Sequence, residues 1–232
     1  KVPAYPRPRI AVITTGSELV DTGRLRGAPT GGRKPDVNGV ALACAVVEVG
    51  AMSYRVGPVA DDPALLRKIL DDQLGRADMV VTTGGIGDGA DDVLRPVLAT
   101  MGTVDFARVA LEPGRVQGTG SLGTSNVPLI ALPGEPTAAF VGFELFVRPV
   151  IRRLMGHGDV FGMRQQVTLT ESVTVDPQNT RIVAVKLDAE RATPIGTGIR
   201  ALTRADALAV IPPGPVDYDS GDVVTAALVS AL

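Results

Sequence analysis

Cysteine and histidine are nearly absent from this sequence of 232 residues. The only cysteine is Cys44, so the chain cannot form an internal disulfide bond or a multi-cysteine metal site. Cys44 lies in an apolar run, and we expect it to pack as a small hydrophobic residue. The only histidine, His157, follows the end of a predicted helix, and we assign it no role.

An excess of positive or negative charge is also lacking, because the formal net charge is only −2. Lysine occurs only at Lys1, Lys34, Lys68 and Lys186, so arginine carries most of the positive charge. This balance gives no electrostatic argument for a nucleic acid or an anionic membrane as partner. No apolar run approaches the length of a membrane span and no signal peptide is present, so we expect a cytoplasmic protein.

What the sequence does contain is ample apolar material, 45% of its residues, which can form a sizeable core. Residues 1–8 are rich in proline and predict a linker. The apolar pattern predicts strands at 9–15, 52–59, 79–83, 104–110, 115–121 and 127–132. Helices are predicted from near Asn38 to Gly50 with Asp36 or Asn38 as cap, after Asp61 or Asp62 as cap, from Asp92 to Gly102, and over 137–155. Alternating strands and helices predict a three-layer α/β domain with a mostly parallel sheet over 9–156.

The pattern changes after Gly156. Short segments of alternating apolar and polar residues follow at 163–175, 181–187, 207–211 and 223–229, separated by turns rich in proline and glycine. Short strands at this spacing predict a small all-β, barrel-like domain over 162–232.

A glycine-rich loop follows the predicted strand at 79–83. It contains Gly84, Gly85, Gly87 and Gly89, and it ends at Asp91 and Asp92 where a helix begins. Strand, glycine loop and helix N-terminus can present backbone N–H groups to an anionic ligand. A carboxylate beside such a loop indicates a bridging divalent cation, or hydrogen bonds to a base or pterin edge. The alternative is a tight turn in which Asp92 is only a helix N-cap.

Three other loops have similar positions, each at the end of a strand or the start of a helix. They are TTGSEL at 14–19, DVNG at 36–39 and LPGEP at 132–136. Because ligands gather at the carboxyl edge of a parallel sheet, we expect all four loops to form one site.

In their order along the chain these motifs resemble the molybdopterin-binding domain shared by the MoeA and MogA families of molybdenum-cofactor synthesis, over roughly 9–156. The resemblance rests on Thr15-Gly16-Ser17-Glu18-Leu19, Asp36-Val37-Asn38, the 57–62 segment GPVADD, Gly84-Gly85 with Gly89 and Asp92, Pro113-Gly114-Arg115, and Leu132-Pro133-Gly134-Glu135-Pro136. The last motif and the β-rich tail, with Ala205-Asp206-Ala207-Leu208 leading to Pro212, favour MoeA over MogA.

The resemblance implies a molybdotransferase. Such a protein takes adenylylated molybdopterin and molybdate and, with Mg²⁺, releases AMP and molybdenum cofactor. The residues that the resemblance points to as catalytic are Glu18, Asp92 and Asp36, and the carboxylates available for Mg²⁺ are Asp92, Asp36 and Asp61. Asp61 ranks last among the metal ligands because it is also a candidate helix cap.

Residues expected to bind the pterin substrate or its phosphates are Thr15, Gly16, Ser17, Asn38, Thr83, Gly84, Gly85, Gly87, Gly89, Arg115, Pro133, Gly134 and Pro136. Among these, Arg115 is the expected contact for molybdate or the terminal phosphate. The two prolines are expected to shape the pocket wall.

The sequence departs from the family pattern at four positions of interest. Gly87 stands where the family usually has serine, Ala90 where it has an acid, Glu112 where a basic residue is common, and Glu135 where asparagine is usual. MoeA proteins also carry two further domains ahead of this region. The chain begins at the linker without an initiator methionine, so we expect a fragment, a processed protein or a shortened homologue. The family further implies a homodimer and a MogA-like adenylyltransferase as pathway partner.

Two other functions remain open on the sequence. CinA-like enzymes, which are nucleotide pyrophosphatases or deamidases, share the T-G-x-E-L motif and a G-G-x-G-x-x-x-D-D loop that fits Gly84 to Asp92. The LPGEP motif, the PGR segment and the β-rich tail stand against that assignment. A non-catalytic molybdopterin-binding or scaffold module is the third.

Overall fold

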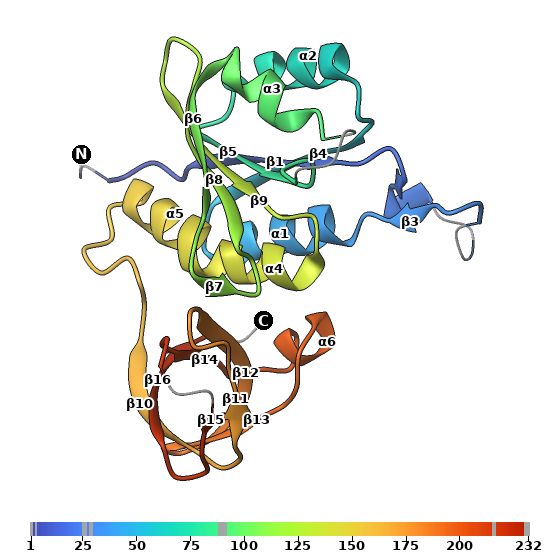
Figure 1. The fold of residues 1–232 in the computed structure, drawn as a ribbon. Coiled ribbons are helices and arrows are strands. Elements are labelled where there is room, and N and C mark those ends of the chain that lie inside the picture. Colours follow the sequence, from blue (N-terminus) through green and yellow to red (C-terminus); the bar gives the residue numbers. More distant parts are fainter. Residues whose placement is uncertain are drawn as a thin grey trace. The chain divides into compact units, whose positions relative to one another are not determined.

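The computed structural model describes residues 2, 4–24, 27, 30–87, 92–214 and 217–229 (Figure 1). The chain divides into two compact units. Unit 1 comprises Lys1–Arg108 and Val116–Val160, and unit 2 comprises Val109–Arg115 and Phe161–Leu232. The described residues include no helix that is long and apolar enough to cross a membrane.

Unit 1 is built on a six-stranded sheet with the order β4-β1-β5-β9-β8-β6. These strands span Met52–Val59 (β4), Arg9–Thr15 (β1), Met79–Thr83 (β5), Val127–Leu132 (β9), Val116–Leu122 (β8) and Gly102–Arg108 (β6). The first four are parallel, whereas β8 pairs antiparallel with both of its neighbours. The expected α/β fold with a mostly parallel sheet is therefore confirmed.

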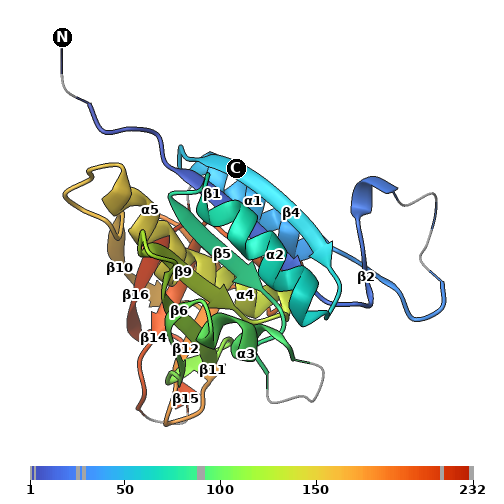
Figure 2. The ribbon, with the colours of Figure 1, turned by 90° about the horizontal axis from the view of Figure 1, so that it is seen from above.

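Helices cover both faces of this sheet (Figures 1 and 2). They are α1 (Val37–Glu48), α2 (Pro63–Leu74), α3 (Leu94–Ala99), α4 (Pro136–Gly142), the π-helical turn η2 (Phe143–Val147) and α5 (Arg148–Leu154). Successive strand residues point to opposite faces, so Ile13 packs in the core with α2 and α3, while Val12 packs with α1 and α5. The helix expected over 137–155 is thus present, with one π-helical turn in its middle.

The structure decides between the expected helix caps. Asp36 caps α1, since its Oδ1 accepts from Gly39 N at 2.8 Å. For α2 the cap is Asp62 rather than Asp61. The cap position of α3 is Val93, without a side-chain hydrogen bond, so Asp92 is not its N-cap. α3 also ends at Ala99, short of the expected Gly102.

Cys44 is exposed, contrary to the expectation that it packs in the core. On α1 the buried positions are Leu42, Ala45 and Val46. Helical periodicity places residue 44 away from these positions, although its sequence neighbours are apolar.

Unit 2 is a small barrel. Its sheet order is β13-β10-β16-β14-β12-β7, and an additional pairing of β13 with β12 closes the ring. The strands span Arg191–Pro194 (β13), Arg164–Leu169 (β10), Val223–Leu228 (β16), Ala207–Ile211 (β14), Thr180–Asp188 (β12) and Leu111–Glu112 (β7). The smaller elements are β11 (Val173–Thr174), β15 (Asp217–Tyr218) and α6 (Ile199–Leu202). This confirms the barrel-like expectation.

One strand of unit 2 comes from the middle of the sequence of unit 1. β7 pairs in parallel with β12, with Leu111 opposite Thr180. Leu111 is buried. From the sequence, residues 104–110 and 115–121 were expected to be two strands of the α/β domain joined by a turn. The structure instead ends β6 at Arg108, starts β8 at Val116, and gives the segment between them to the barrel.

Candidate functional site

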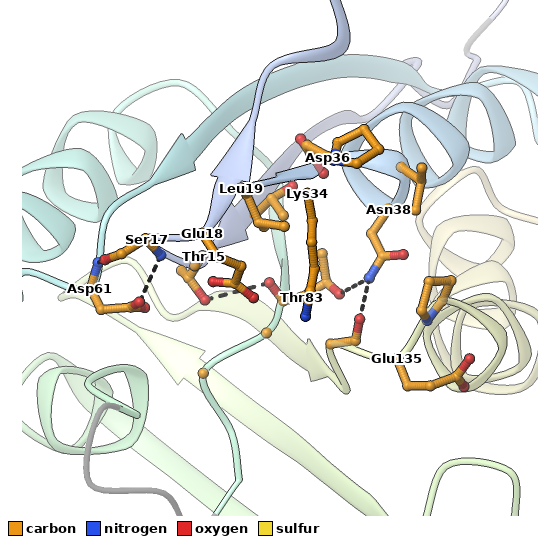
Figure 3. A pocket seen from close by; sticks show the side chains of 18 of the residues that line it. Thr15, Ser17, Glu18, Leu19, Lys34, Asp36, Asn38, Asp61, Thr83 and Glu135 are labelled. Carbon is orange, nitrogen blue, oxygen red and sulfur yellow. Dashed lines mark hydrogen bonds between the residues drawn. The ribbon is translucent and has the colours of Figure 1, made fainter. Parts of the chain in front are cut away.

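A cavity of about 1160 Å³ opens in unit 1 where β1 and β5 end. All four loops singled out in the sequence contribute to its lining (Figure 3). The expected site residues that line it are Thr15, Gly16, Ser17, Glu18, Asp36, Asn38, Asp61, Thr83, Gly84, Gly85, Asp92, Gly134 and Pro136. The carboxyl ends of parallel strands meet at one sheet edge, which is why loops far apart in sequence converge here.

Four expected residues stand differently. Pro133 is not part of the lining but lies directly behind it, because its carbonyl accepts a hydrogen bond from Thr83 Oγ1 at 2.8 Å. Gly87 is also outside the lining. Gly89 lies outside the described residues, as do Ala90 and Asp91. Arg115 belongs to unit 2.

Asn38 connects three of the loops. Its Nδ2 donates to Thr83 Oγ1 at 3.0 Å and to the carbonyl of Gly134 at 2.9 Å. The Asn38 side chain is buried, so these hydrogen bonds are expensive to lose. Asn38 thereby fixes the start of α1 against the end of β5 and the loop before α4.

The glycine pair serves close backbone packing. Gly84 has φ +92°, and a Cβ there would lie 2.5 Å from the carbonyl oxygen of Thr15. Gly85 has φ +65°, and its Cβ would lie 3.0 Å from Thr15 Oγ1. Both positions therefore need glycine for backbone conformation, and Gly84 also for the approach of β5 to β1. Neither observation requires a bound ligand. The helix that follows, α3, has only six residues, so its dipole adds little.

Asp61 holds the loop after β1. Its Oδ2 accepts from Ser17 N at 2.7 Å, and Ser17 Oγ accepts from Asp61 N at 2.9 Å. This reciprocal pair fixes the segment that carries Glu18. The structure therefore gives Asp61 a role that the sequence did not indicate, and it assigns the cap of α2 to Asp62. Metal binding by Asp61 stays a prediction.

Asp36 is almost fully buried. While its Oδ1 caps α1, its Oδ2 has no hydrogen-bond partner and lies 3.7 Å from Arg55 Nε. A buried carboxylate oxygen without a donor can accept a ligand hydrogen bond or contact a cation.

Asp36, Asp61 and Asp92 line the same cavity but do not form a ready-made metal cluster. Among the residues described, no three acidic, histidine or cysteine side chains are close enough together to hold a metal ion. Carboxylates and hydroxyls are nevertheless the donors that Mg²⁺ prefers, and the cavity wall provides both kinds. The donor chemistry fits Mg²⁺ held through only one or two carboxylates.

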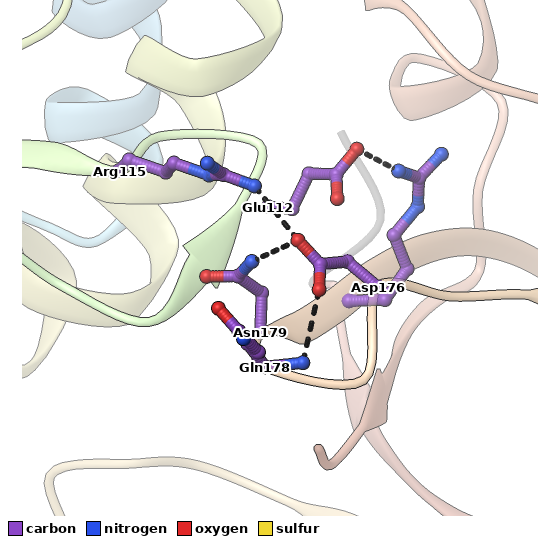
Figure 4. A network of polar contacts seen from close by, with 6 residues as sticks. Glu112, Arg115, Asp176, Gln178 and Asn179 are labelled. Carbon is purple, nitrogen blue, oxygen red and sulfur yellow. Dashed lines mark hydrogen bonds and ion pairs between the residues drawn. The ribbon is translucent and has the colours of Figure 1, made fainter. Parts of the chain in front are cut away.

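Arg115 does not line this cavity; it forms an ion pair within unit 2 (Figure 4). Its Nη2 lies 2.9 Å from Asp176 Oδ2. The pKa of Asp176 is lowered, first by the hydrogen bond that it accepts from Gln178 N. Glu112, expected beside the anion site, pairs with Arg181 on β12. Both residues of the PGR region thus connect β7 and its turn to the barrel, which local sequence could not reveal.

Sequence reasoning missed Lys34 as a lining residue. It lies in β3 (Lys34–Pro35), which pairs with β2 (Leu19–Val20), near the short helix η1 (Thr22–Arg24). These two-residue strands carry no periodic signal. The remaining hint was that lysine is rare in this chain and that this one lies two residues before the Asp36 cap.

The chain thus combines an α/β unit, which has a cavity at the carboxyl edge of its sheet, with a small β barrel. This is the two-domain class that the sequence motifs indicated. Residues 11–153 match the family described as a probable molybdopterin binding domain. Residues 166–229 match the MoeA C-terminal region (domain IV). The chain belongs to the MoeA family of molybdopterin-binding proteins.

Its relatives carry consistent names. Molybdopterin molybdenumtransferase 1 of Mycobacterium tuberculosis is 45% identical over 67% of this chain and 36% of the relative. Molybdopterin molybdenumtransferase 2 of that organism is 33% identical over 95% of this chain and 56% of the relative. A molybdopterin biosynthesis MoeA protein from Pyrococcus horikosii has a TM-score of 0.79 at 29% identity, over 96% of this chain and 54% of that one. The chain therefore spans between about a third and slightly more than half of the length of these relatives.

Proposed function

We propose that this chain is the substrate-binding and C-terminal part of a molybdopterin molybdenumtransferase. It takes adenylylated molybdopterin and molybdate and releases AMP in a Mg²⁺-dependent step. The observation that carries the proposal is the convergence of Glu18, Asp61 and Asp92 on one cavity of about 1160 Å³. That volume accommodates a ligand of the size of a pterin nucleotide.

The residues that line the cavity would have different roles in binding the ligand and the cation. Asn38 and its partners Thr83 and Gly134 hold the wall rigid, so the ligand meets a preorganised surface. The Ser17–Asp61 pair orients Glu18 toward the cavity. Asp92 and Asp36 Oδ2, which accepts no hydrogen bond and faces Arg55, would hold Mg²⁺, directly or through water. The cation supplies charge neutralisation on the phosphates while the anhydride is cleaved.

Several finer features belong to the same proposal. We take residues 9–156 and 162–232 as the two domains, with Val109–Arg115 completing the sheet of the second. The protein would act in the cytoplasm as a homodimer and receive its substrate from a MogA-like adenylyltransferase. Glu18, Asp36 and Asp92 would be the catalytic residues.

The proposal is tested by titrating the chain with adenylylated molybdopterin and then adding molybdate and Mg²⁺ while AMP is measured. Binding followed by Mg²⁺-dependent AMP release supports it. Binding without release would indicate a non-catalytic module, and the absence of binding would overturn the proposal. Hydrolysis of a nucleotide-sugar pyrophosphate instead would favour the CinA-like alternative.

Asp92→Asn is expected to lower Mg²⁺-dependent AMP release roughly 10- to 100-fold, because the amide keeps an oxygen donor but loses the negative charge that holds the cation. The rate is measured against Mg²⁺ concentration, where the variant should need more cation for half-maximal turnover. Asp72→Asn, on α2 and exposed, is the matched control. An unchanged Mg²⁺ dependence in Asp92→Asn would remove this residue from the site.

A further inference from the structure

The charge of the cavity lining is one-sided. Its described acidic residues are Glu18, Asp36, Asp61, Asp92 and Glu135, and its only described basic residue is Lys34. A ligand that carries phosphate would be repelled by these carboxylates unless a cation meets it. Lys34 is the cation that this part of the chain itself provides.

The backbone of Lys34 is fixed next to the TTGSEL loop at 14–19. Lys34 N donates to the carbonyl of Glu18 at 2.8 Å, and Lys34 pairs with Leu19 in the β2–β3 ladder. From this position the side chain is among those that line the cavity (Figure 3). The ladder therefore anchors the backbone of a residue whose long, charged side chain lines the cavity.

The ammonium group of Lys34 has unused hydrogen-bond donors. Within the described chain, Lys34 Nζ forms no hydrogen bond or ion pair, although five carboxylates line the same cavity. Several of them are engaged elsewhere: Glu135 accepts from Thr137 N and Ala138 N, and Asp61 accepts from Ser17 N. An ammonium group has three donors and no acceptor, so an anion is its natural partner.

The neighbouring polar groups cannot take over this role. Asn38 Nδ2 donates twice within the protein, and the Thr83 hydroxyl donates to the carbonyl of Pro133. Arg115, expected from the sequence to contact the anion, pairs with Asp176 in unit 2. The Thr14 hydroxyl also has no partner, but it is buried. Among the described residues that line the cavity, Lys34 is thus the charged side chain with free donors.

We propose that Lys34 binds a tetrahedral oxyanion of the ligand, a phosphate or molybdate, in this cavity. The identity of the ligand rests on the proposed function, whereas the anion-binding property of Lys34 does not. The ammonium acts as a point charge that determines preference for phosphorylated over unphosphorylated pterin.

The test compares the wild-type chain with Lys34→Met and Lys34→Arg, and with Lys68→Met as control for the loss of an exposed lysine on α2. Each is titrated with molybdopterin, with the same pterin after phosphatase treatment, and with molybdate and inorganic phosphate alone. Lys34 is exposed, so its variants should keep the wild-type circular dichroism spectrum.

Lys34→Met is expected to bind molybdopterin roughly 10- to 100-fold more weakly, as for the loss of a charged hydrogen bond, and the dephosphorylated pterin equally well. Lys34→Arg should recover part of the loss. Selective loss of molybdate binding instead would identify molybdate as the anion. Equal affinities of Lys34→Met and wild type for all four probes would overturn the inference. If wild type binds neither pterin, the proposed function fails, and the two inorganic anions alone decide the role of Lys34.

Discussion

Arg148→Met is expected to lower the free energy of unfolding of unit 1 by about 3–5 kcal/mol at neutral pH, because it leaves two buried carboxylates without a partner. On α5, Arg148 Nε lies 2.6 Å from Glu144 Oε2, and its Nη2 lies 3.0 Å from Glu48 Oε2 at the end of α1. The exposed fractions of the Arg148, Glu144 and Glu48 side chains are 12%, 8% and 17%. The methionine fills similar volume, so the loss is mainly one of charge.

The loss of stability caused by Arg148→Met should be smaller at acidic pH than at neutral pH. Burial raises the pKa of Glu144. The hydrogen bond to Arg148 and the charge of Arg148 lower this pKa, but burial has the larger effect. Removing the arginine takes away the interactions that lower the pKa of Glu144, so its folded-state pKa rises further above the unfolded value of about 4.3. The folded variant then binds more protons than the unfolded chain in weak acid, so its stability falls as pH rises through that window. The deficit is therefore smaller near the unfolded pKa than at neutrality.

Urea unfolding followed by the helical circular dichroism signal, at weakly acidic and neutral pH, measures this deficit. Most helical residues lie in unit 1, so the signal reports mainly on that unit. The matched control is Arg67→Met. Arg67 pairs with Asp71, and the exposed fractions of the two side chains are 50% and 56%. Exposed pairs contribute about 0–1 kcal/mol. A deficit for Arg148→Met no larger than that of Arg67→Met, or one independent of pH, would contradict the argument.

Gly84→Ala is the second change with a large expected effect. Its φ of +92° is strained for alanine, and the new Cβ would lie 2.5 Å from the carbonyl oxygen of Thr15, which is backbone and cannot rotate away. Strain at such a position costs about 1–3 kcal/mol, and the clash must add to it or be relieved by separating β1 from β5. We expect a loss of about 3 kcal/mol in stability together with weaker ligand binding.

Gly75→Ala is the matched control for this change. Gly75 has φ −78° at the C-terminal end of α2, and a Cβ there meets nothing within 4 Å. Alanine at such a position is neutral or stabilises by about 0.4–1 kcal/mol through the unfolded state. Urea midpoints and molybdopterin affinity are compared for both variants. If Gly84→Ala keeps wild-type stability, the close approach of the two strand ends is not a constraint on the fold.

Much of the fold follows from local pattern. The β-branched run at 79–83 and the alternation after residue 163 identified strands that the structure contains at Met79–Thr83 and Arg164–Leu169. Strand and helix periodicities are properties of neighbouring residues, so they can be recognised without the tertiary structure. The convergence of the four loops also followed, because parallel strands necessarily direct their carboxyl ends to one edge.

The features that local pattern did not predict depend on partners distant in sequence. Asp61 bonds to Ser17, and Arg115 pairs with Asp176 in unit 2. Cys44 has apolar neighbours in the sequence, yet it faces away from the buried stripe of α1. Each of these outcomes is decided by geometry that side-chain type alone does not encode.

The sequence by itself determined the layered α/β architecture, the barrel that follows it, the family resemblance and the set of loops that meet at the cavity. Only the tertiary structure decided that residues 109–115 pair with the barrel, that the glycine pair lets β5 approach β1, and that Lys34 lines the same cavity as the carboxylates. Periodicity reports which side of an element is buried. It carries no information about which distant element supplies the partner, because that choice depends on packing and pairing across the whole chain.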